Sequence, residues 1–254
     1  MNLSELLQKL SYGQLSELPI AGEGTGVVPE ANIPKLVVRI NDALAKLYAR
    51  FDLQKRTVIL ETVDGVYAYQ LAPQFAQTSG SSEPNKYLKD TVANPFLDDV
   101  LQVTAILANQ AALPTDPNYI TTPRLDENDY IPMPLNDVED RLSWHTLSFD
   151  TLAMDYPKTG DRYFIQYRAK HAPIPLKPDD LDKVQIRIPS QLETALLSHI
   201  AGNVYAGMSM EMSLAKSQQL LALYEAECKF HEERDTFTQF NESGNVKPLL
   251  GGWV

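Results

Sequence analysis

The sequence contains one cysteine, Cys228, and no run of apolar residues long enough to cross a membrane. A single cysteine cannot form a disulfide within the chain, so we expect a fold that does not depend on an oxidising compartment. A helix that spans a bilayer needs about 20 predominantly apolar residues, and no segment approaches that length. The first residues, MNLSELLQKL, are charged and amphipathic, unlike the apolar core of a signal peptide. These features predict a soluble protein that is not exported by the usual route.

Basic residues are also scarce. The chain has 22 Lys and Arg against 33 Asp and Glu, which gives a formal net charge of −11. A protein whose main function is to bind nucleic acid needs clustered cations that neutralise phosphates, and this balance argues against that class. The apolar share of 44% is ordinary for a globular protein, and 254 residues suffice for one large domain or two modest ones.

The sequence lacks the common nucleotide-binding motifs. Gly22, Gly24 and Gly26 alternate in a short segment that superficially resembles a phosphate-binding loop. No strand-like segment precedes this loop, and no Lys-Ser or Lys-Thr pair follows it, so the context that such a motif needs is missing. We therefore predict no cofactor site here.

Candidate metal ligands and catalytic residues are few and scattered. Cys228 and His231 share one face of a predicted helix, but a structural zinc site needs four ligands and no second Cys/His pair exists. We interpret this pair as packing and predict no metal site. Asp126, Glu127 and Asp129 could form a catalytic carboxylate pair, whose separation is a three-dimensional quantity that a sequence does not give. No catalytic constellation is predicted, and these acids keep an enzyme as the alternative.

Two segments near the N-terminus have helical periodicity. Residues 2–10 begin with Asn2 and Glu5, which have the spacing of a capping box. Residues 34–51 begin with Pro34, which suits a first helical turn. Their apolar positions follow the three- and four-residue spacing of a helix packed lengthwise on other helices: Val37, Ile40, Leu44, Leu47 and Phe51.

Four basic residues lie off the apolar seam of the 34–51 helix, and they form a candidate interface. They are Lys35, Arg39, Lys46 and Arg50. A solvated helix face is the simpler explanation, because exposed charges contribute little by themselves. The functional alternative is a basic face that meets a partner.

Residues 190–235 predict a helical hairpin. Ser190 and Glu193 have capping-box spacing, and apolar residues then recur every four residues, at Leu192, Leu196, Ile200 and Val204. Gly207 interrupts the pattern, and Ser209 with Glu211 begins a second helix.

The segment between the helical regions changes to the two-residue period of strands. Residues 57–71 predict a hairpin that turns at Asp64-Gly65, and we also expect strands at 98–110, 144–154, 162–169 and 184–188. The proline- and acid-rich stretch 114–134 predicts a long loop or excursion. The expected fold is α+β: a helical bundle from residues 1–56 and 189–237, a β-rich insert at 57–188 and an extended C-terminal arm at 238–254.

Three segments in this order resemble the head–tail adaptor, or connector, proteins of short-tailed bacteriophages, including the kind called tubular tail protein A. The first is SELLQKLSYGQLS followed by IPKLVVRINDALAKLYARF and TVILE. The second is DRYFIQYRAKHAPI, and the third is IPSQLETALLSHIAGNVYAGM with the acidic helix and tail that follow. They span most of the chain, whereas the 114–134 excursion has no place in the pattern.

The resemblance implies a non-enzymatic virion structural protein at the head–tail junction, assembled in the host cytoplasm and without cofactors. Such proteins form a ring, usually of twelve copies, between the portal protein and the tail tube or nozzle protein. DNA passes through the ring during ejection without sequence-specific binding. The resemblance places Lys35, Arg39, Lys46 and Arg50 in the ring-forming bundle and turns the β-rich insert towards the tail. It makes the C-terminal arm portal-binding, through Phe240, Leu249, Leu250, Trp253 and Val254.

Two other functions stay open from the sequence. One is a carboxylate-dependent hydrolase of the virion, which would use acids such as Asp126, Glu127 and Asp129. The other is a host-directed binding protein with a single cellular target.

Overall fold

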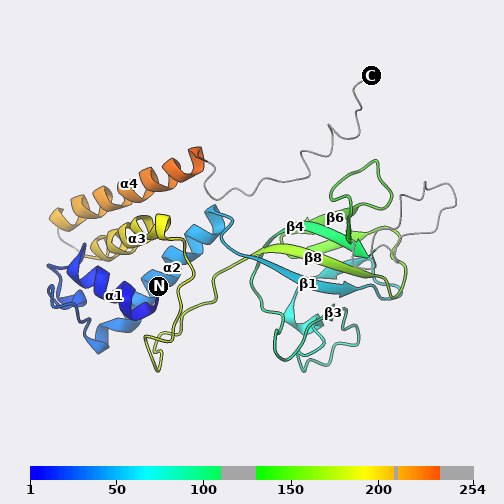
Figure 1. The fold of residues 1–254 in the computed structure, drawn as a ribbon, viewed down its shortest axis with the longest axis horizontal. Helices are drawn as coiled ribbons and strands as arrows, with labels where there is room; N and C mark the ends of the chain where they lie inside the picture. Colours follow the sequence, from blue (N-terminus) through cyan, green and yellow to red (C-terminus); the bar gives the residue numbers. More distant parts are fainter. Residues whose placement is uncertain (110–129, 209–210, 235–254) are drawn as a thin grey trace, which may run out of the picture. The chain divides into compact units, whose positions relative to one another are not determined.

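The structure is a computed structural model that describes residues 1–109, 130–208 and 211–234. The chain divides into two compact units, one formed by Met1–Leu53 with His171–Val254 and the other by Gln54–Lys170. Within the described residues, the first unit is helical and the second consists mainly of strands (Figure 1). The fold is therefore mixed α and β, as the sequence predicted.

The helical unit contains four α-helices in its described part. They are α1 (Leu3–Tyr12), α2 (Ile33–Arg50), α3 (Glu193–Ala206) and α4 (Glu211–Glu233), with short 3-10 turns η1 (Pro19–Ala21), η2 (Glu30–Asn32) and η5 (Ser190–Leu192). Helix α3 packs against both α2 and α4 (Figure 1). The predicted seam of α2 is confirmed, since every one of its five apolar residues is buried. No helix in the described ranges is long and apolar enough to span a bilayer.

The first helix has the predicted capping box. The side chain of Asn2 accepts a hydrogen bond from Glu5 N at 2.7 Å, and Asn2 N donates to Glu5 Oε2 at 3.0 Å. The capping box predicted at Ser190 and Glu193 does not form. Residues 190–192 form the turn η5, so α3 begins at Glu193 with Leu192 as its N-cap. The carboxylate of Glu193 instead binds Lys9 of α1, at the N-terminus of α3.

Residues 171–188, which the sequence analysis assigned to the insert, lie with the helical unit. The side chain of Asn41 in α2 exchanges two hydrogen bonds of 2.9 Å with the backbone of Ile174. The strand predicted at 184–188 is wrong, because its strand-like pairing is limited to an isolated bridge between Asn2 and Gln185, flanked by backbone hydrogen bonds to Met1 and Leu3.

The second unit holds two antiparallel sheets. The five-stranded sheet has the order β3-β1-β8-β4-β5, and the three-stranded sheet has the order β2-β7-β6. Their strands are β1 (Lys55–Glu61), β2 (Ala68–Gln70), β3 (Leu88–Lys89), β4 (Val100–Asn109), β5 (Tyr130–Pro132), β6 (Trp144–Ser148), β7 (Thr151–Met154) and β8 (Arg162–Ala169), with a 3-10 turn η3 (Pro73–Phe75). Strands β4 and β8 match the predicted segments, whereas the single strand predicted at 144–154 is wrong, because β6 and β7 divide this segment into an antiparallel hairpin.

The hairpin predicted across Asp64-Gly65 is wrong. Strand β1 pairs with β8 over seven residues, from Lys55–Arg168 to Glu61–Arg162, whereas β2 pairs with β7 in the other sheet. Gly65 does form a turn, at φ +72°, but this turn carries the chain from one sheet to the other. Alternating apolar residues predict a strand without specifying its partner.

Aromatic side chains from both sheets form the core of the β unit. Trp144 of β6 is fully buried, with its ring centroid 5.0 Å from that of Tyr163 in β8 and 5.8 Å from that of Tyr69 in β2. Because β8 lies in the five-stranded sheet and the other two strands in the three-stranded sheet, these contacts join the inner faces of both. Large aromatic surfaces contribute strongly to such a core.

Candidate assembly surfaces

Helix α2 places the four predicted basic residues on one side, because their spacings of four and seven residues repeat the helical period. Their environments nevertheless differ. Lys35 and Lys46 are exposed, whereas Arg39 and Arg50 are half-buried. The four residues therefore do not form one uniform charged face.

Arg50 is engaged within the chain. Its Nε and Nη2 atoms donate to the two carboxylate oxygens of Glu232 at 2.6 and 2.9 Å, and its Nη1 donates to Glu225 at 2.7 Å. The hydrogen bonds from Arg50 hold the pKa of Glu232 below its usual value. Arg50 thus fastens α2 to α4, and we retain Lys35, Arg39 and Lys46 as candidates for contact with a partner.

Lys35 and Arg39 line a groove with a volume of about 460 Å³. Its other lining residues come from η1, α2, the end of α3 and the residues that follow α3: Ile20, Val38, Val204, Gly207 and Met208. Apolar side chains thus form most of the groove, and two cations stand on its α2 side. We call this feature the groove.

Arg39 lies beside the C-terminus of α3, where a helix dipole attracts a cation. A Cβ atom built at Gly207 would lie 3.8 Å from Arg39 Nη2, an ordinary contact distance, which shows how near the guanidinium group is to this helix end. Lys35 Nζ donates a hydrogen bond of 3.3 Å to Asn32 Oδ1. Among the described residues neither cation has an ion-pair partner, which leaves both charges available to a ligand in the groove.

The charge of Lys46 contributes to the lowered pKa of a buried histidine, His199. His199 of α3 is 1% exposed, and its ring lies edge-on to Tyr224 of α4 with centroids 4.7 Å apart. Burial, with a smaller contribution from the charge of Lys46, lowers the pKa of His199 to about 4, against opposing effects of Asp42 and Glu225. His199 is therefore a neutral packing residue at the α3–α4 contact at neutral pH.

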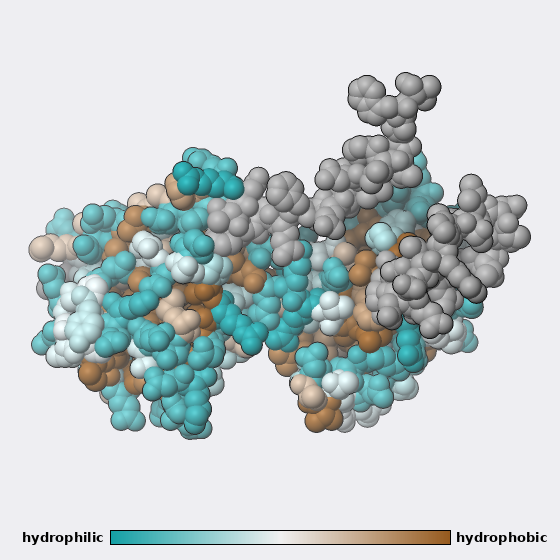
Figure 2. All heavy atoms as spheres, in the orientation of Figure 1, coloured by the Kyte–Doolittle hydropathy of each residue, from teal (hydrophilic) through white to brown (hydrophobic). Residues whose placement is uncertain are grey.

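Helix α4 buries one side and exposes apolar residues on another. The buried side packs on α3, and its buried residues are Ser213, Ser217, Leu220, Tyr224, Cys228 and His231. Away from it, a strip of exposed, mostly apolar residues runs along the helix: Met212, Ala215, Gln219, Ala222, Leu223, Ala226 and Phe230. We call this strip the α4 stripe. Figure 2 shows apolar atoms at the surface of the helical unit among polar ones.

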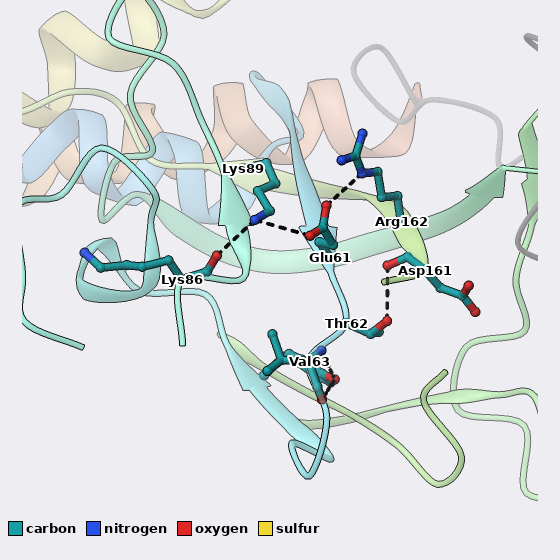
Figure 3. A network of polar contacts seen from close by, with 8 residues as sticks. Glu61, Thr62, Val63, Lys86, Lys89, Asp161 and Arg162 are labelled. Atoms are coloured by element: carbon teal, nitrogen blue, oxygen red, sulfur yellow. Dashed lines mark hydrogen bonds and ion pairs between the residues drawn. The ribbon is translucent and has the colours of Figure 1, made fainter. Parts of the chain in front are cut away.

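The β unit carries a polar network at one end of β1. Glu61 lies between Arg162 of β8 and Lys89 of β3, with N–O distances of 2.8 and 3.4 Å (Figure 3). Partial burial opposes ionisation of Glu61, but hydrogen bonds and charges from Arg162 and Lys89 outweigh it and lower its pKa. The network joins three neighbouring strands, and we assign it a structural role.

The remaining sequence candidates show no chemistry where the structure describes them. Cys228 is fully buried, and His231 Nε2 lies 3.1 Å from the Gln191 carbonyl oxygen, so both belong to the packing of α4. No group of three His, Cys, Asp or Glu among the described residues is placed to hold a metal ion.

The glycine-rich loop also lacks a phosphate site. The N–H groups of Glu23, Thr25 and Gly26 donate hydrogen bonds within the chain, to Leu18 O, Gly22 O and Ser11 Oγ. These donors are therefore not free to hold an anion.

Other predicted site residues lie outside the described ranges. They are the carboxylates Asp126, Glu127 and Asp129 and the arm residues Phe240, Leu249, Leu250, Trp253 and Val254.

No protein-family model matches the chain, and no curated protein matches its sequence. The candidate surfaces are therefore identified from the geometry of the structure. Sequence reasoning missed the groove because its lining comes from separate segments that only the fold brings together. One signal was present: Val38 is an apolar residue on the basic side of α2, between Lys35 and Arg39, and it is 42% exposed.

Proposed function

We propose that the protein is a head–tail adaptor, a non-enzymatic structural protein that forms a ring between the portal and the tail of a short-tailed bacteriophage. In this proposal the four helices form the bundle that builds the ring, usually of twelve copies. The β unit is the insert that faces the tail tube or nozzle protein. The arm at 238–254 reaches the portal, and DNA passes through the ring.

The observation that carries the proposal is the α4 stripe. Met212 is 86% exposed, Phe230 45% and Leu223 40%, on a helix whose other side already packs on α3. A second apolar strip on one helix costs free energy in water, at roughly 25 cal/mol per Å² of exposed apolar surface, unless another surface covers it. Repeated copies in a closed ring would provide such a cover.

The charge of the chain supports a conduit. A net charge of −11 repels phosphate groups, so a wall with this balance of charge would not hold passing DNA. A connector must let DNA through, so weak attraction is an advantage.

Electron microscopy of the full-length protein, alone and mixed with its portal protein, tests the proposal. We expect closed rings that bind portal rings, and a chain without residues 240–254 should still form rings but lose the portal. The proposal fails if the full-length protein stays monomeric at every concentration and never joins portal rings.

A further inference from the structure

We propose that the groove of one copy receives the α4 stripe of the next copy, so that the two surfaces form one head-to-tail subunit contact. This inference rests on the proposed function and goes beyond it, because it names the two surfaces that meet. The chemistry of each surface supports the pairing.

The shape of the α4 stripe suits insertion into a groove. At 100° per residue, its seven residues fall within a sector of about 100° around the helix axis. Alanines occupy three of the seven positions, while Met212, Leu223 and Phe230 project as larger side chains. Spacings of three and four residues produce the ridges that pack into grooves on neighbouring helices. The stripe is therefore a ridge, and the groove beside α2 and the end of α3 is a matching concave surface.

The charges of the two surfaces are complementary. The groove presents Lys35 and Arg39 beside apolar side chains. In the C-terminal half of the stripe, Glu227 lies four residues after Leu223 and three before Phe230, which places it on the flank of the stripe, where it is half-buried. It has no ion-pair partner among the described residues, whereas the cation of Arg234 is already engaged, 4.0 Å above the Phe230 ring. Opposite charges at the rim of an apolar contact fix its register and speed encounter. We therefore place the C-terminal half of the stripe in the groove, with Glu227 facing the two cations.

A methionine side chain adds adaptability to the contact. Met208 lines the groove that receives the C-terminal half of the stripe. The unbranched, polarisable thioether fills irregular gaps, so methionines suit a surface that forms only on assembly.

The contact must be made between copies. The stripe lies on the side of α4 turned away from α3, whereas Val204, Gly207 and Met208 of the groove lie at the end of α3 in the same copy. Two different surfaces that bind each other form a heterologous contact, which closes into a ring when the rotation between copies is suitable. Each copy would then give one stripe and accept another.

A mixing experiment with two variants tests this arrangement. Val38→Glu places an acid in the groove, and Leu223→Asp places an acid on the stripe, both at exposed positions. Each variant alone should be monomeric, because it lacks one half of the contact. An equimolar mixture should give one-to-one dimers, since each variant keeps the surface that the other has lost. Mass photometry measures all three samples, and circular dichroism establishes that each variant is folded.

Leu214→Asp is the matched control. Leu214 is 53% exposed on the same helix, but it lies nine residues from Leu223, which places it about 180° around the axis. This variant should still form rings.

The outcomes separate the inference from the proposed function. If the wild type forms rings and both Val38→Glu and Leu223→Asp still form them, or if their mixture stays monomeric, the named surfaces are wrong while the adaptor proposal stands. Loss of rings in Leu214→Asp would also overturn the assignment. If the wild type never forms rings, the proposed function fails and the inference fails with it.

Discussion

Small and polar side chains determine how closely α3 and α4 approach. Ser217 Oγ donates a hydrogen bond of 2.8 Å to the Gly202 carbonyl oxygen inside the contact. A Cβ atom at Gly202 would lie 2.9 Å from the side chain of Leu221, so only glycine fits there without movement. His199 adds a hydrogen bond with Asn203, at 3.0 Å from its Nδ1. The contact is therefore tight but contains a group that can gain a proton.

His199 should make stability depend on pH. Its folded-state pKa of about 4 is below the unfolded value of 6.5, so the unfolded chain binds the proton more tightly. Its contribution to the free energy of unfolding is fully present above pH 6.5 and is lost as pH falls to about 4. The total loss should be of the order of 3 kcal/mol.

Urea unfolding of the wild type and of His199→Gln between pH 7 and 4 measures this effect. The variant should lose less stability than the wild type over that range, because glutamine does not titrate. Identical losses in the two proteins would contradict the assignment to His199.

Helix ends show how local sequence and tertiary contacts compete. Asn2 caps α1 as its spacing with Glu5 predicts. Ser190 has the same spacing with Glu193, yet its hydroxyl makes no cap, because η5 takes the place of the first turn. Burial of Leu192, which is 0% exposed, accompanies this turn. The two capping-box motifs therefore have the same spacing, but only the one at Asn2 caps its helix.

Alanine substitutions at these two positions should differ in effect. Asn2→Ala removes a capping side chain and should lower the free energy of unfolding by about 1 kcal/mol. Ser190→Ala removes an exposed hydroxyl without a capping role and should change it by less than about 0.5 kcal/mol. Urea titrations give both values, and Asn2→Ser should retain most of the stability. An equal loss at both positions would refute the distinction.

The helices and most of the strands followed from the sequence, whereas the strand partners did not. The seam from Val37 to Phe51 defines α2, since a helix repeats its own pattern within one segment. The partner of β1 is β8, about 100 residues away, and nothing in the pattern of β1 names it. The short turn at Gly65 led us to predict that β1 pairs with the next strand along the chain. Strand β1 instead pairs with β8 over seven residues.

At the scale of the molecule, the β unit is one continuous segment between two parts of the helical unit. Its ends meet, because Ala169 N donates a hydrogen bond of 2.9 Å to Gln54 O. Its aromatic core is formed by its own residues. Both features indicate that the unit can fold without the rest of the chain.

We expect residues 54–170 to fold as an isolated fragment with cooperative thermal unfolding. Trp144 is the single tryptophan of this fragment, so its fluorescence reports on the core. A longer fragment, 54–188, should have the same melting temperature, because Ile174 hydrogen-bonds to α2 and stabilises only the helical unit. Absence of a cooperative transition in 54–170, or a clearly higher melting temperature for 54–188, would contradict this division.

The candidate surfaces were predictable only in part. The basic residues of α2 are visible in the sequence, but Arg50 turned out to bind Glu225 and Glu232, which lie about 180 residues further along the chain. The groove joins Ile20 with Met208 across a similar separation. Side chains that meet through tertiary packing carry no shared local pattern, so their roles become visible only in the fold.

The meeting ends of the β unit also determine how it would respond to force. Strands β1 and β8 are antiparallel neighbours, and the chain enters at Lys55 and leaves at Ala169, at the same end of the pair. Tension transmitted through these two connections would peel β1 from β8 and load the ladder hydrogen bonds one after another, since those bonds lie perpendicular to the strands. The β unit would thus yield by unzipping at low force, while pulling along the strands would load all the bonds together.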